Sequence, residues 1–475
     1  MRLIKNFFWN VFYQIFVLII PLITVPYVSR VLGPRGIGIT AYTNSVVTYF
    51  VLFAGIGITT YGNREVAYVR DNKRKLTNTF FEIILLRCLT VFIALIAFFI
   101  FIKFTPNYRF YYLLQSIQIV SVLFDVSWFF MGLENFRITV MRNALIKIIT
   151  FVLILVFIRN KQDLAFYILI LAISTLIGNI SLIPYLKKYI YVPNFHSLNI
   201  WRHLKPSLIL FIPQIAIQIY VVLNKTVLGK MISVEASGYF DNSDKIIKMI
   251  LAIVTATGTV MLPNIANKFI KGDNEAIKRY LYLSFDFVSA ISIPMTCGIA
   301  AVSLKFAPWF FGAGFKQVGF MMLIESLIII IVGWANVIGG QFLLPTNQNT
   351  AYTVAVVFGA ITSIIVNIPL IHTFGMIGAV IATVLSEVSV LAYELWIVKG
   401  QLNIGKLFQQ VWKYFIAGIL MWAVVHELNL NLTFNIYTFI LEILVGMSVY
   451  VLLILVLRAP ILKSVRLIIS KKNKM

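Results

Sequence analysis

Two amide side chains and a lysine follow one face of an apolar run near the middle of the chain. Gln214, Gln218 and Lys225 stand at relative positions i, i+4 and i+11, which a helix places in one stripe. A polar group inside hydrocarbon costs free energy, so it usually faces a cavity or a neighbouring helix. The stripe is therefore predicted to line an aqueous cleft, with the lysine near one end.

The next apolar run opens with two further lysines, Lys245 and Lys248. Their face of the predicted helix can converge on the same cleft. Asp241 and Asp244 precede them by four residues, so a second interpretation is that each lysine pairs with an aspartate at the mouth of a helix. Lys225 has no acidic residue at helical spacing and is therefore the stronger binding candidate.

Polar and charged groups also interrupt the apolar runs of the first part of the chain. Asn44 stands inside the second run, and Arg87 and Asp125 stand in the third and fourth. At 1.5 Å per residue, both charges lie roughly 9–12 Å from the inner ends of their helices, so they can meet. A structural ion pair is the favoured interpretation, and a role in coupling is the alternative.

Two glutamates lie two helical turns apart near the end of the twelfth run. A protonatable carboxylate at Glu387 or Glu394 can sense an ion gradient across the membrane. The alternative for Glu394 is that its side chain extends to the inner interface.

Signatures of enzymes, metals and cofactors are absent from the sequence. The segment GQLNIGKL at Gly400–Leu407 matches a phosphate-binding loop only in part, because leucine replaces the metal-binding hydroxyl residue and no strand precedes it. Cys88, Cys297 and four histidines are scattered without ligand spacing. We predict no catalytic residue, no metal, no cofactor and no disulfide framework.

Composition defines the elements that must position these groups. The 475 residues are 60% hydrophobic and only 12% charged, with a mean hydropathy of +0.92, which is typical of a polytopic membrane protein. Runs of the length needed to cross a bilayer as a helix number about fourteen. Their centres lie near Leu18, Tyr49, Thr90, Val120, Phe151, Ile173, Ala216, Ala252, Ser289, Ile329, Ile361, Leu385, Leu420 and Leu444. We expect an all-α membrane protein, with kinks at Pro21 and Gly55.

The net charge of +23 is distributed unevenly between the two predicted sides of the membrane. With a cytoplasmic N-terminus, about 26 basic residues lie inside and about nine outside, as topogenic signals require. An even number of spans places both termini in the cytoplasm. The basic loops need no nucleic-acid partner.

A hydrophilic connection divides the predicted spans into two groups. We expect an N-terminal bundle of six spans at 1–185, a cytoplasmic linker at 186–206, a second bundle of six at 207–398, and two appended spans with a basic tail at 399–475. SRVLGPRGIGITAYTNS after the first span has a weak counterpart in NKTVLGKMISVEASGYFDNSDK after the seventh. This similarity predicts that the two halves are repeats with the same orientation in the membrane.

Several segments together resemble the Wzx-type polysaccharide flippases of the multidrug/oligosaccharidyl-lipid/polysaccharide exporter superfamily. They are VPYVSRVLGPRGIGITAY from position 25, YGNREVA from 61, WFFMGLENF from 128, FGAGF from 311 and FGMIGAVIATVLSE from 374. The resemblance implies two six-helix bundles with alternating access in a bacterial cytoplasmic membrane. It also implies a substrate of sugars on a polyprenyl diphosphate, destined for the polysaccharide polymerase machinery.

The resemblance gives the basic residues a ligand. Gly33, Pro34 and the following glycines are expected to form a tight exit turn, with Arg30 at the outer mouth of the first span. The repeat places Lys225, Lys245 and Lys248 at the same level, and four cations there would attract a diphosphate. The alternative for Arg30 is that it only bonds the carbonyls at the end of its own helix.

Two other classes of function fit such a membrane protein. A drug or cation antiporter of the same superfamily would be expected to have an acidic cavity, whereas the predicted mouth is basic. A membrane-embedded polysaccharide polymerase would be expected to carry a long outer loop, which the sequence lacks.

Overall fold

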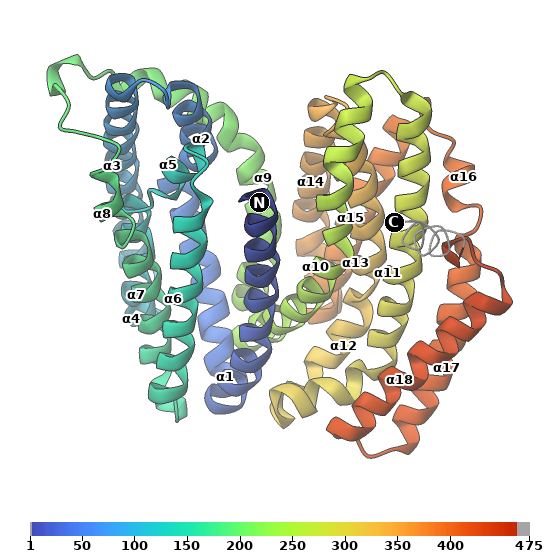
Figure 1. Ribbon diagram of the computed structural model, residues 1–475. Coiled ribbons are helices and arrows are strands. Elements are labelled where there is room, and N and C mark those ends of the chain that lie inside the picture. The colour runs from blue at the N-terminus through green and yellow to red at the C-terminus, as the bar shows by residue number, and fades with distance from the viewer. Residues whose placement is uncertain (1, 463–475) are drawn as a thin grey trace. The chain divides into compact units, whose positions relative to one another are not determined.

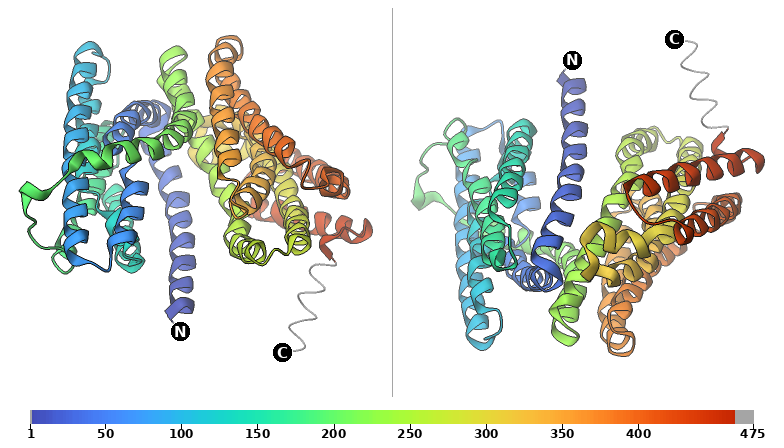
Figure 2. Two further views of the ribbon diagram at one scale, coloured as in Figure 1. Left: turned by 90° about the horizontal axis from the view of Figure 1, so that it is seen from above. Right: turned by 90° about the horizontal axis from the view of Figure 1, so that it is seen from below.

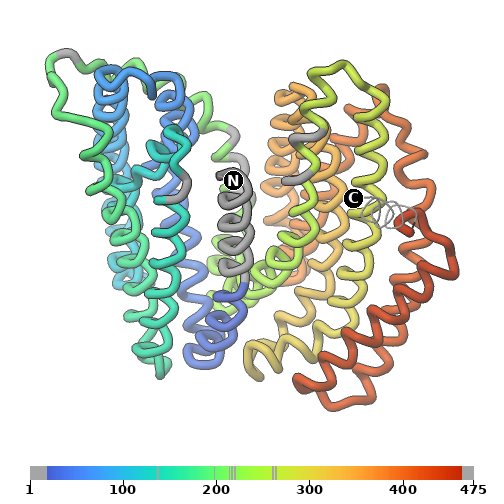
Figure 3. The backbone as a smooth tube through the Cα atoms, viewed as in Figure 1, coloured from blue at the N-terminus to red at the C-terminus, as the bar shows by residue number. Residues whose placement is uncertain are grey.

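The computed structural model describes residues 2–462 (Figures 1 and 3). Side chains are described outside positions 2–18, 136–137, 197, 213, 216–217, 219–220, 259–260 and 263–264. This part of the chain is helical and contains no strand. Contacts divide the chain into two compact units, Met1–Gly238 and Tyr239–Met475.

The first unit is a helical bundle followed by an irregular connection and a long helix. Its elements are α1 (Arg2–Gly55), α2 (Ile58–Val69), α3 (Lys73–Phe104), α4 (Arg109–Leu123), α5 (Ser127–Gly132), α6 (Phe136–Phe157), η1 (Lys161–Asp163), α7 (Leu164–Ile180), α8 (Ile183–Leu186), η2 (Phe195–Ser197), η3 (Ile200–His203) and α9 (Leu204–Met231). Helix α10 (Val234–Ile270) begins in this unit and continues into the second.

The second unit continues with long helices and one broken span. Its further elements are α11 (Asn274–Phe311), η4 (Ala313–Phe315), α12 (Lys316–Glu325), α13 (Leu327–Ala335), η5 (Asn336–Leu343), α14 (Asn349–Phe374), α15 (Met376–Val398), α16 (Ile404–Phe408), α17 (Val411–Asn431) and α18 (Ile436–Val456). A short connection turns the chain between α17 and α18, which lie side by side (Figure 2).

The apolar runs of the sequence become helices. Each of the fourteen predicted centres falls inside a helix, which confirms the all-α membrane fold. Within the described residues, ten helices are long and apolar enough to cross a membrane, or eleven with the bent pair around Ser326. The first two predicted spans both lie in α1, while α9 and α10 are not among the ten. The number fourteen stays a prediction.

Helix α1 contains a sharp change of direction at Gly33 (Figure 1). The φ of this residue is 69°, in the left-handed region that glycine adopts without steric cost, and Pro34 starts the following segment. Where the sequence predicts a tight turn between the first two spans, α1 bends at one residue, Gly33, and continues as a helix on both sides of it. The break predicted at Gly55 is present, since α1 ends there, but backbone angles at Pro21 remain helical.

Apolar and aromatic side chains form the core of each unit. In the first unit, Phe98 and Tyr112 pack between α1, α3 and α4, while Trp128 stacks on Phe80 at a centroid distance of 5.7 Å. In the second, Phe285 of α11 stacks on Trp334 at 5.6 Å. Many apolar side chains remain exposed, as a lipid solvent allows.

Candidate functional site

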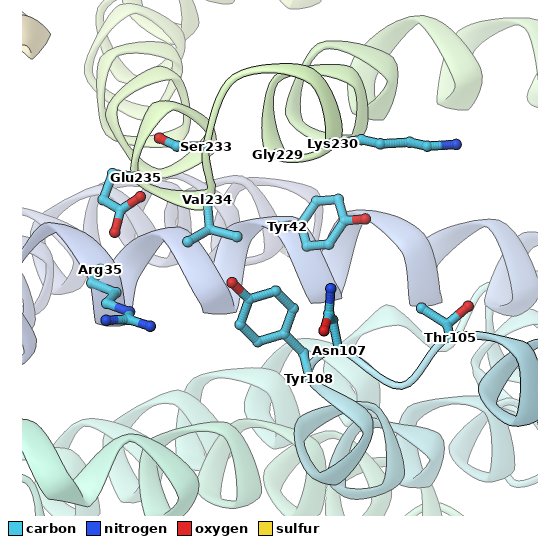
Figure 4. Close-up of a pocket in the computed structure, with 10 residues that line it drawn as sticks. All are labelled: Arg35, Tyr42, Thr105, Asn107, Tyr108, Gly229, Lys230, Ser233, Val234 and Glu235. Atoms are coloured by element: carbon cyan, nitrogen blue, oxygen red, sulfur yellow. The ribbon is translucent and has the colours of Figure 1, made fainter.

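A pocket of about 470 Å³ lies within the first unit, where several helices end (Figure 4). Two stretches that resemble each other in sequence, residues 29–45 and 224–245, are called the repeat-like segments here. The lining combines charged, aromatic and small polar side chains from these two segments and from the α3–α4 connection. The lining residues are Arg35, Tyr42, Thr105, Asn107, Tyr108, Gly229, Lys230, Ser233, Val234 and Glu235. Because α3 is 32 residues long, the pocket lies about 48 Å along that helix from its first residue.

Close backbone packing holds the two repeat-like segments together. A Cβ atom added at Gly38 would collide with the Val234 carbonyl, and one added at Gly229 would collide with the Tyr42 ring. Glycine at these positions therefore lets α1 approach the α9–α10 connection closely enough to form one wall of the pocket. The similarity that the sequence shows between these segments corresponds to a direct contact.

Charged groups lie at opposite ends of the pocket. Arg35 and Glu235 lie at one end, Lys230 extends at the other, and Tyr42 and Tyr108 lie between them (Figure 4). Arg35 and Lys230 are exposed, and neither forms an ion pair with the described residues. Both cations are therefore available to a ligand.

Polar residues of the predicted cleft form hydrogen bonds between helices of the first unit. The Gln214 amide donates to Thr60 Oγ1 at 2.7 Å, and Gln118 donates to Asn44 Oδ1 at 3.2 Å. Asn44 is exposed and Gln218 and Lys225 are partly exposed along α9.

Arg30 and Lys225 both belong to the first unit. Arg30 is exposed on the last turn before Gly33, and Lys225 is half-buried on α9, the helix that packs against α1. Next to Lys225, Thr226 Oγ1 lies 2.9 Å from Ser45 Oγ of α1. The binding roles of Arg30 and Lys225 stay predictions.

Lys245 and Lys248, in the first half of α10, have acidic partners on the same helix. Lys245 pairs with Asp241 at 2.5 Å and Lys248 with Asp244 at 2.8 Å, each at the i+4 spacing. The second interpretation, in which each lysine pairs with the aspartate four residues before it, therefore agrees with the structure. Both lysine side chains are still 41–49% exposed, so they can also contact a ligand.

Arg87 and Asp125 meet, but not through the Asp125 carboxylate. The fully buried Arg87 guanidinium donates to the carbonyl oxygens of Val122 and Asp125 and lies 5.9 Å from the Trp128 ring. The carboxylate instead accepts from the Ser127 amide at 3.0 Å and from its hydroxyl at 2.5 Å. A main-chain contact thus takes the place of the expected ion pair, because the carboxylate turns to Ser127, the first residue of α5, instead of to Arg87.

Glu394 lies in the interior of the second unit. It is 1% exposed, and within the described residues its Oε2 atom has no hydrogen-bond partner. A Cβ at Gly339 would collide with Oε1, which places the carboxylate against the π-helix η5. The alternative that Glu394 extends to the interface is therefore wrong, while Glu387 on the same helix is half-buried.

A polar cluster with a buried centre, at the start of α9, was not predicted from the sequence. The Tyr61 hydroxyl lies 2.6 Å from His203 Nδ1, and His203 Nε2 lies 2.8 Å from Glu82 Oε2. Glu82 also accepts from the Asn199 amide at 2.8 Å and from Arg202. We call these five residues the linker cluster, because they hold the end of the connection between α8 and α9 against α2 and α3.

Protonation of the linker cluster follows from its contacts. With a proton on Nε2, His203 donates to Glu82 and accepts from Tyr61 at Nδ1, so the neutral ring satisfies both partners. Burial lowers the pKa of His203 below its ordinary value of 6.5, outweighing the hydrogen bond to Glu82, which acts in the opposite direction. The ring is therefore neutral at pH 7.

Sequence comparisons connect the chain with proteins of polysaccharide assembly. The family described as polysaccharide biosynthesis protein matches residues 3–269. A putative O-antigen transporter of Escherichia coli K12 is 23% identical over 80% of this chain and 93% of its own length. The lipid II flippase MurJ of Bacillus subtilis is 22% identical over 33% of this chain and 29% of its own length.

Solved structures of a flippase and of a multidrug transporter have the same fold as this chain. The inward closed conformation of the lipid II flippase MurJ matches with a TM-score of 0.73 and 17% identity, covering 95% of this chain and 98% of that one. An inward-facing multidrug resistance MATE family transporter of the MOP superfamily matches with a TM-score of 0.60 and 13% identity, covering 80% and 94%. The MurJ/MATE-like fold thus extends over nearly the whole chain.

Proposed function

The chain belongs to the polysaccharide biosynthesis protein family, and we propose that it is a flippase for lipid-linked glycans. It moves oligosaccharide units linked to polyprenyl diphosphate from the cytoplasmic to the outer leaflet, where they enter surface polysaccharide assembly. The family match over residues 3–269 carries this proposal, and the O-antigen transporter and flippase names of its relatives support it.

The diphosphate is the part of this substrate that most needs help to cross the bilayer. A charged group pays a large desolvation penalty in hydrocarbon, which fixed cations in a polar cleft reduce. Arg30 and Lys225 serve this role in the first unit. Lys245 and Lys248 are candidate phosphate-binding cations of the second unit, and an aspartate on the same helix partly neutralises each of them. Gln214, Gln218 and Asn44 provide hydrogen bonds along the cleft.

The cycle is one of alternating access, and an ion gradient drives it through a carboxylate. Glu394 is the better candidate than Glu387 for this coupling, because its carboxylate is buried with one oxygen unpaired among the described residues. The protein resides in the bacterial cytoplasmic membrane with both termini inside, and a polysaccharide polymerase consumes its product.

Depletion of the protein in its native cell tests the proposed function. We expect lipid-linked repeat units to accumulate with their glycan accessible only from the cytoplasmic side, and surface polymer to be lost. Accessibility is measured with a membrane-impermeant glycosidase on intact and permeabilised spheroplasts. Unchanged polymer without accumulated lipid would contradict the proposal, and drug sensitivity on depletion would favour the antiporter suggested by the MATE-like fold.

A further inference from the structure

The pocket between the repeat-like segments offers more than a binding surface for diphosphate. We propose that it binds a sugar residue carrying an acidic group, as part of the glycan. This inference rests on the proposed function and names a subsite for the substrate. Its volume of about 470 Å³ lies within the ~300–1,000 Å³ typical of small-molecule sites.

Two tyrosines provide faces for the sugar ring. Tyr42 and Tyr108 pack edge to face at a centroid distance of 6.2 Å and line the middle of the pocket (Figure 4). A tyrosine combines an apolar ring, which suits the C–H face of a pyranose, with a hydroxyl that bonds to its rim. Tyr108 has a φ of 62°, an uncommon conformation for a residue with a side chain, and it directly precedes α4.

Polar groups around these rings match a molecule rich in hydroxyls. Thr105, Asn107 and Ser233 supply hydroxyl and amide groups that both donate and accept. At one end Arg35 only donates and the Glu235 carboxylate only accepts, so together they can bind neighbouring hydroxyls of one ring. A lipid tail would leave all these groups unsatisfied.

The second cation selects for an acidic substituent. Lys230 extends at the end of the pocket away from Glu235 (Figure 4), and it forms no ion pair with the described residues. A carboxylate or phosphate on the sugar would form a charge-assisted hydrogen bond there, which is roughly twice as strong as a neutral one.

Binding to the purified full-length protein in lipid nanodiscs tests the inference. The probes are glucuronic acid, glucose 6-phosphate, glucose and inorganic phosphate, followed by saturation-transfer NMR titration. We expect the acidic sugars to bind about tenfold more tightly than glucose or phosphate, which is the typical effect of one charged hydrogen bond. Arg35→Gln and Lys230→Gln should each raise the Kd of the acidic sugars about tenfold.

Lys316→Gln is the matched control, since Lys316 is an exposed lysine of the second unit outside the pocket. It should leave every Kd unchanged. The inference is overturned if neither acidic sugar gives a saturable signal, if glucose binds equally well, if inorganic phosphate matches glucose 6-phosphate, or if the control weakens binding as much as Lys230→Gln.

A leaflet-accessibility assay on the same wild-type preparation separates the two proposals. Transport of a lipid-linked glycan without binding of either acidic sugar would overturn the pocket assignment and leave the proposed function intact. Binding of the acidic sugars that weakens about tenfold in Arg35→Gln, in a protein that transports no lipid-linked glycan, would support the pocket and contradict the flippase.

Discussion

At the residue scale, Arg87 shows how a buried charge is accommodated in this fold. Its guanidinium has no exposed surface and bonds to two main-chain carbonyls, while its Nε atom has no partner among the described residues. The carbonyls belong to the end of α4 and the connection to α5, where helical hydrogen bonding stops and acceptors are available. Arg87 therefore stabilises this connection through its carbonyl groups, without a direct hydrogen bond to a carboxylate.

Replacing Arg87 should cost more than replacing Asp125. Arg87→Met leaves the carbonyl groups of Val122 and Asp125 without their hydrogen-bond donor. We therefore expect the free energy of unfolding to fall by about 1–3 kcal/mol and the Tm in detergent to be lower. Asp125→Asn keeps its carbonyl and can still accept from Ser127, so a loss below about 1 kcal/mol is expected. Equal losses, with a double variant no worse than either single one, would instead identify the carboxylate as the partner.

Lys225 tests the chemistry of the proposed diphosphate site. Lys225→Ala should reduce flipping without lowering protein abundance, because removing a cation from a membrane helix does not harm insertion. Lys225→Arg should retain part of the activity, since the charge survives in a different shape. Lys225→Glu should be worse than alanine because it repels the diphosphate.

Surface polymer per unit of membrane-inserted protein is the measurement for the Lys225 series. Arg30→Ala should behave like Lys225→Ala. Full polymer from Lys225→Glu at normal abundance would remove Lys225 from the site.

At the scale of elements, the linker cluster makes the junction before α9 sensitive to acid. The pKa of His203 is lowered in the folded protein, so folding favours the neutral ring. The stabilisation is complete above the unfolded pKa of about 6.5 and is lost as the pH falls through the lower folded value. Tyr61, Glu82 and Arg202 contact the ring, and Glu65 lies close enough to affect it.

The Tm of the wild-type protein should therefore fall as the pH is lowered from above to below about 6.5. His203→Gln should flatten this dependence, because glutamine does not titrate. His372→Gln, which alters an exposed histidine of the second unit, should leave the dependence unchanged. Parallel curves for wild type and His203→Gln, measured by thermal unfolding in detergent, would show that another group is responsible.

The sequence predicted the membrane spans but not the contacts between residues that are far apart in the chain. Hydropathy located the spans because bilayer thickness sets the length of each apolar run, as Thr90 in α3 and Leu444 in α18 illustrate. The linker cluster joins Tyr61 and Glu82 to His203 across 142 and 121 residues, and no local pattern encodes such a contact.

The sequence indicated which two segments form the candidate site, but not which of their residues line it. The two repeat-like stretches do meet, yet Arg35 rather than Arg30 lines the pocket that they form. The difference follows from Gly33, because the direction of the chain after a left-handed residue decides which arginine faces the α9–α10 connection. Sequence spacing does not contain that direction.

At the scale of the whole molecule, the distribution of basic residues predicts the orientation in the membrane. Cysteine accessibility measures it, in a background where Cys88 and Cys297 are replaced by serine. Gln162→Cys, in η1 between α6 and α7, should react with an impermeant maleimide from outside. Asp71→Cys, before α3, should react only after permeabilisation. Both positions are exposed. The reverse pattern would place the N-terminus outside and invert the proposed direction of transport.

The contact between Gly38 and the Val234 carbonyl also decides how a substitution map of this protein should be read. Any larger residue at position 38 forces the two segments apart, so a saturation screen scored by surface polymer would rank this glycine among ligand-binding positions. Yet it has no side chain with which to recognise anything. A parallel screen scored by abundance separates the two kinds of position: Gly38 should lose abundance and polymer together, whereas Arg35 should lose polymer alone.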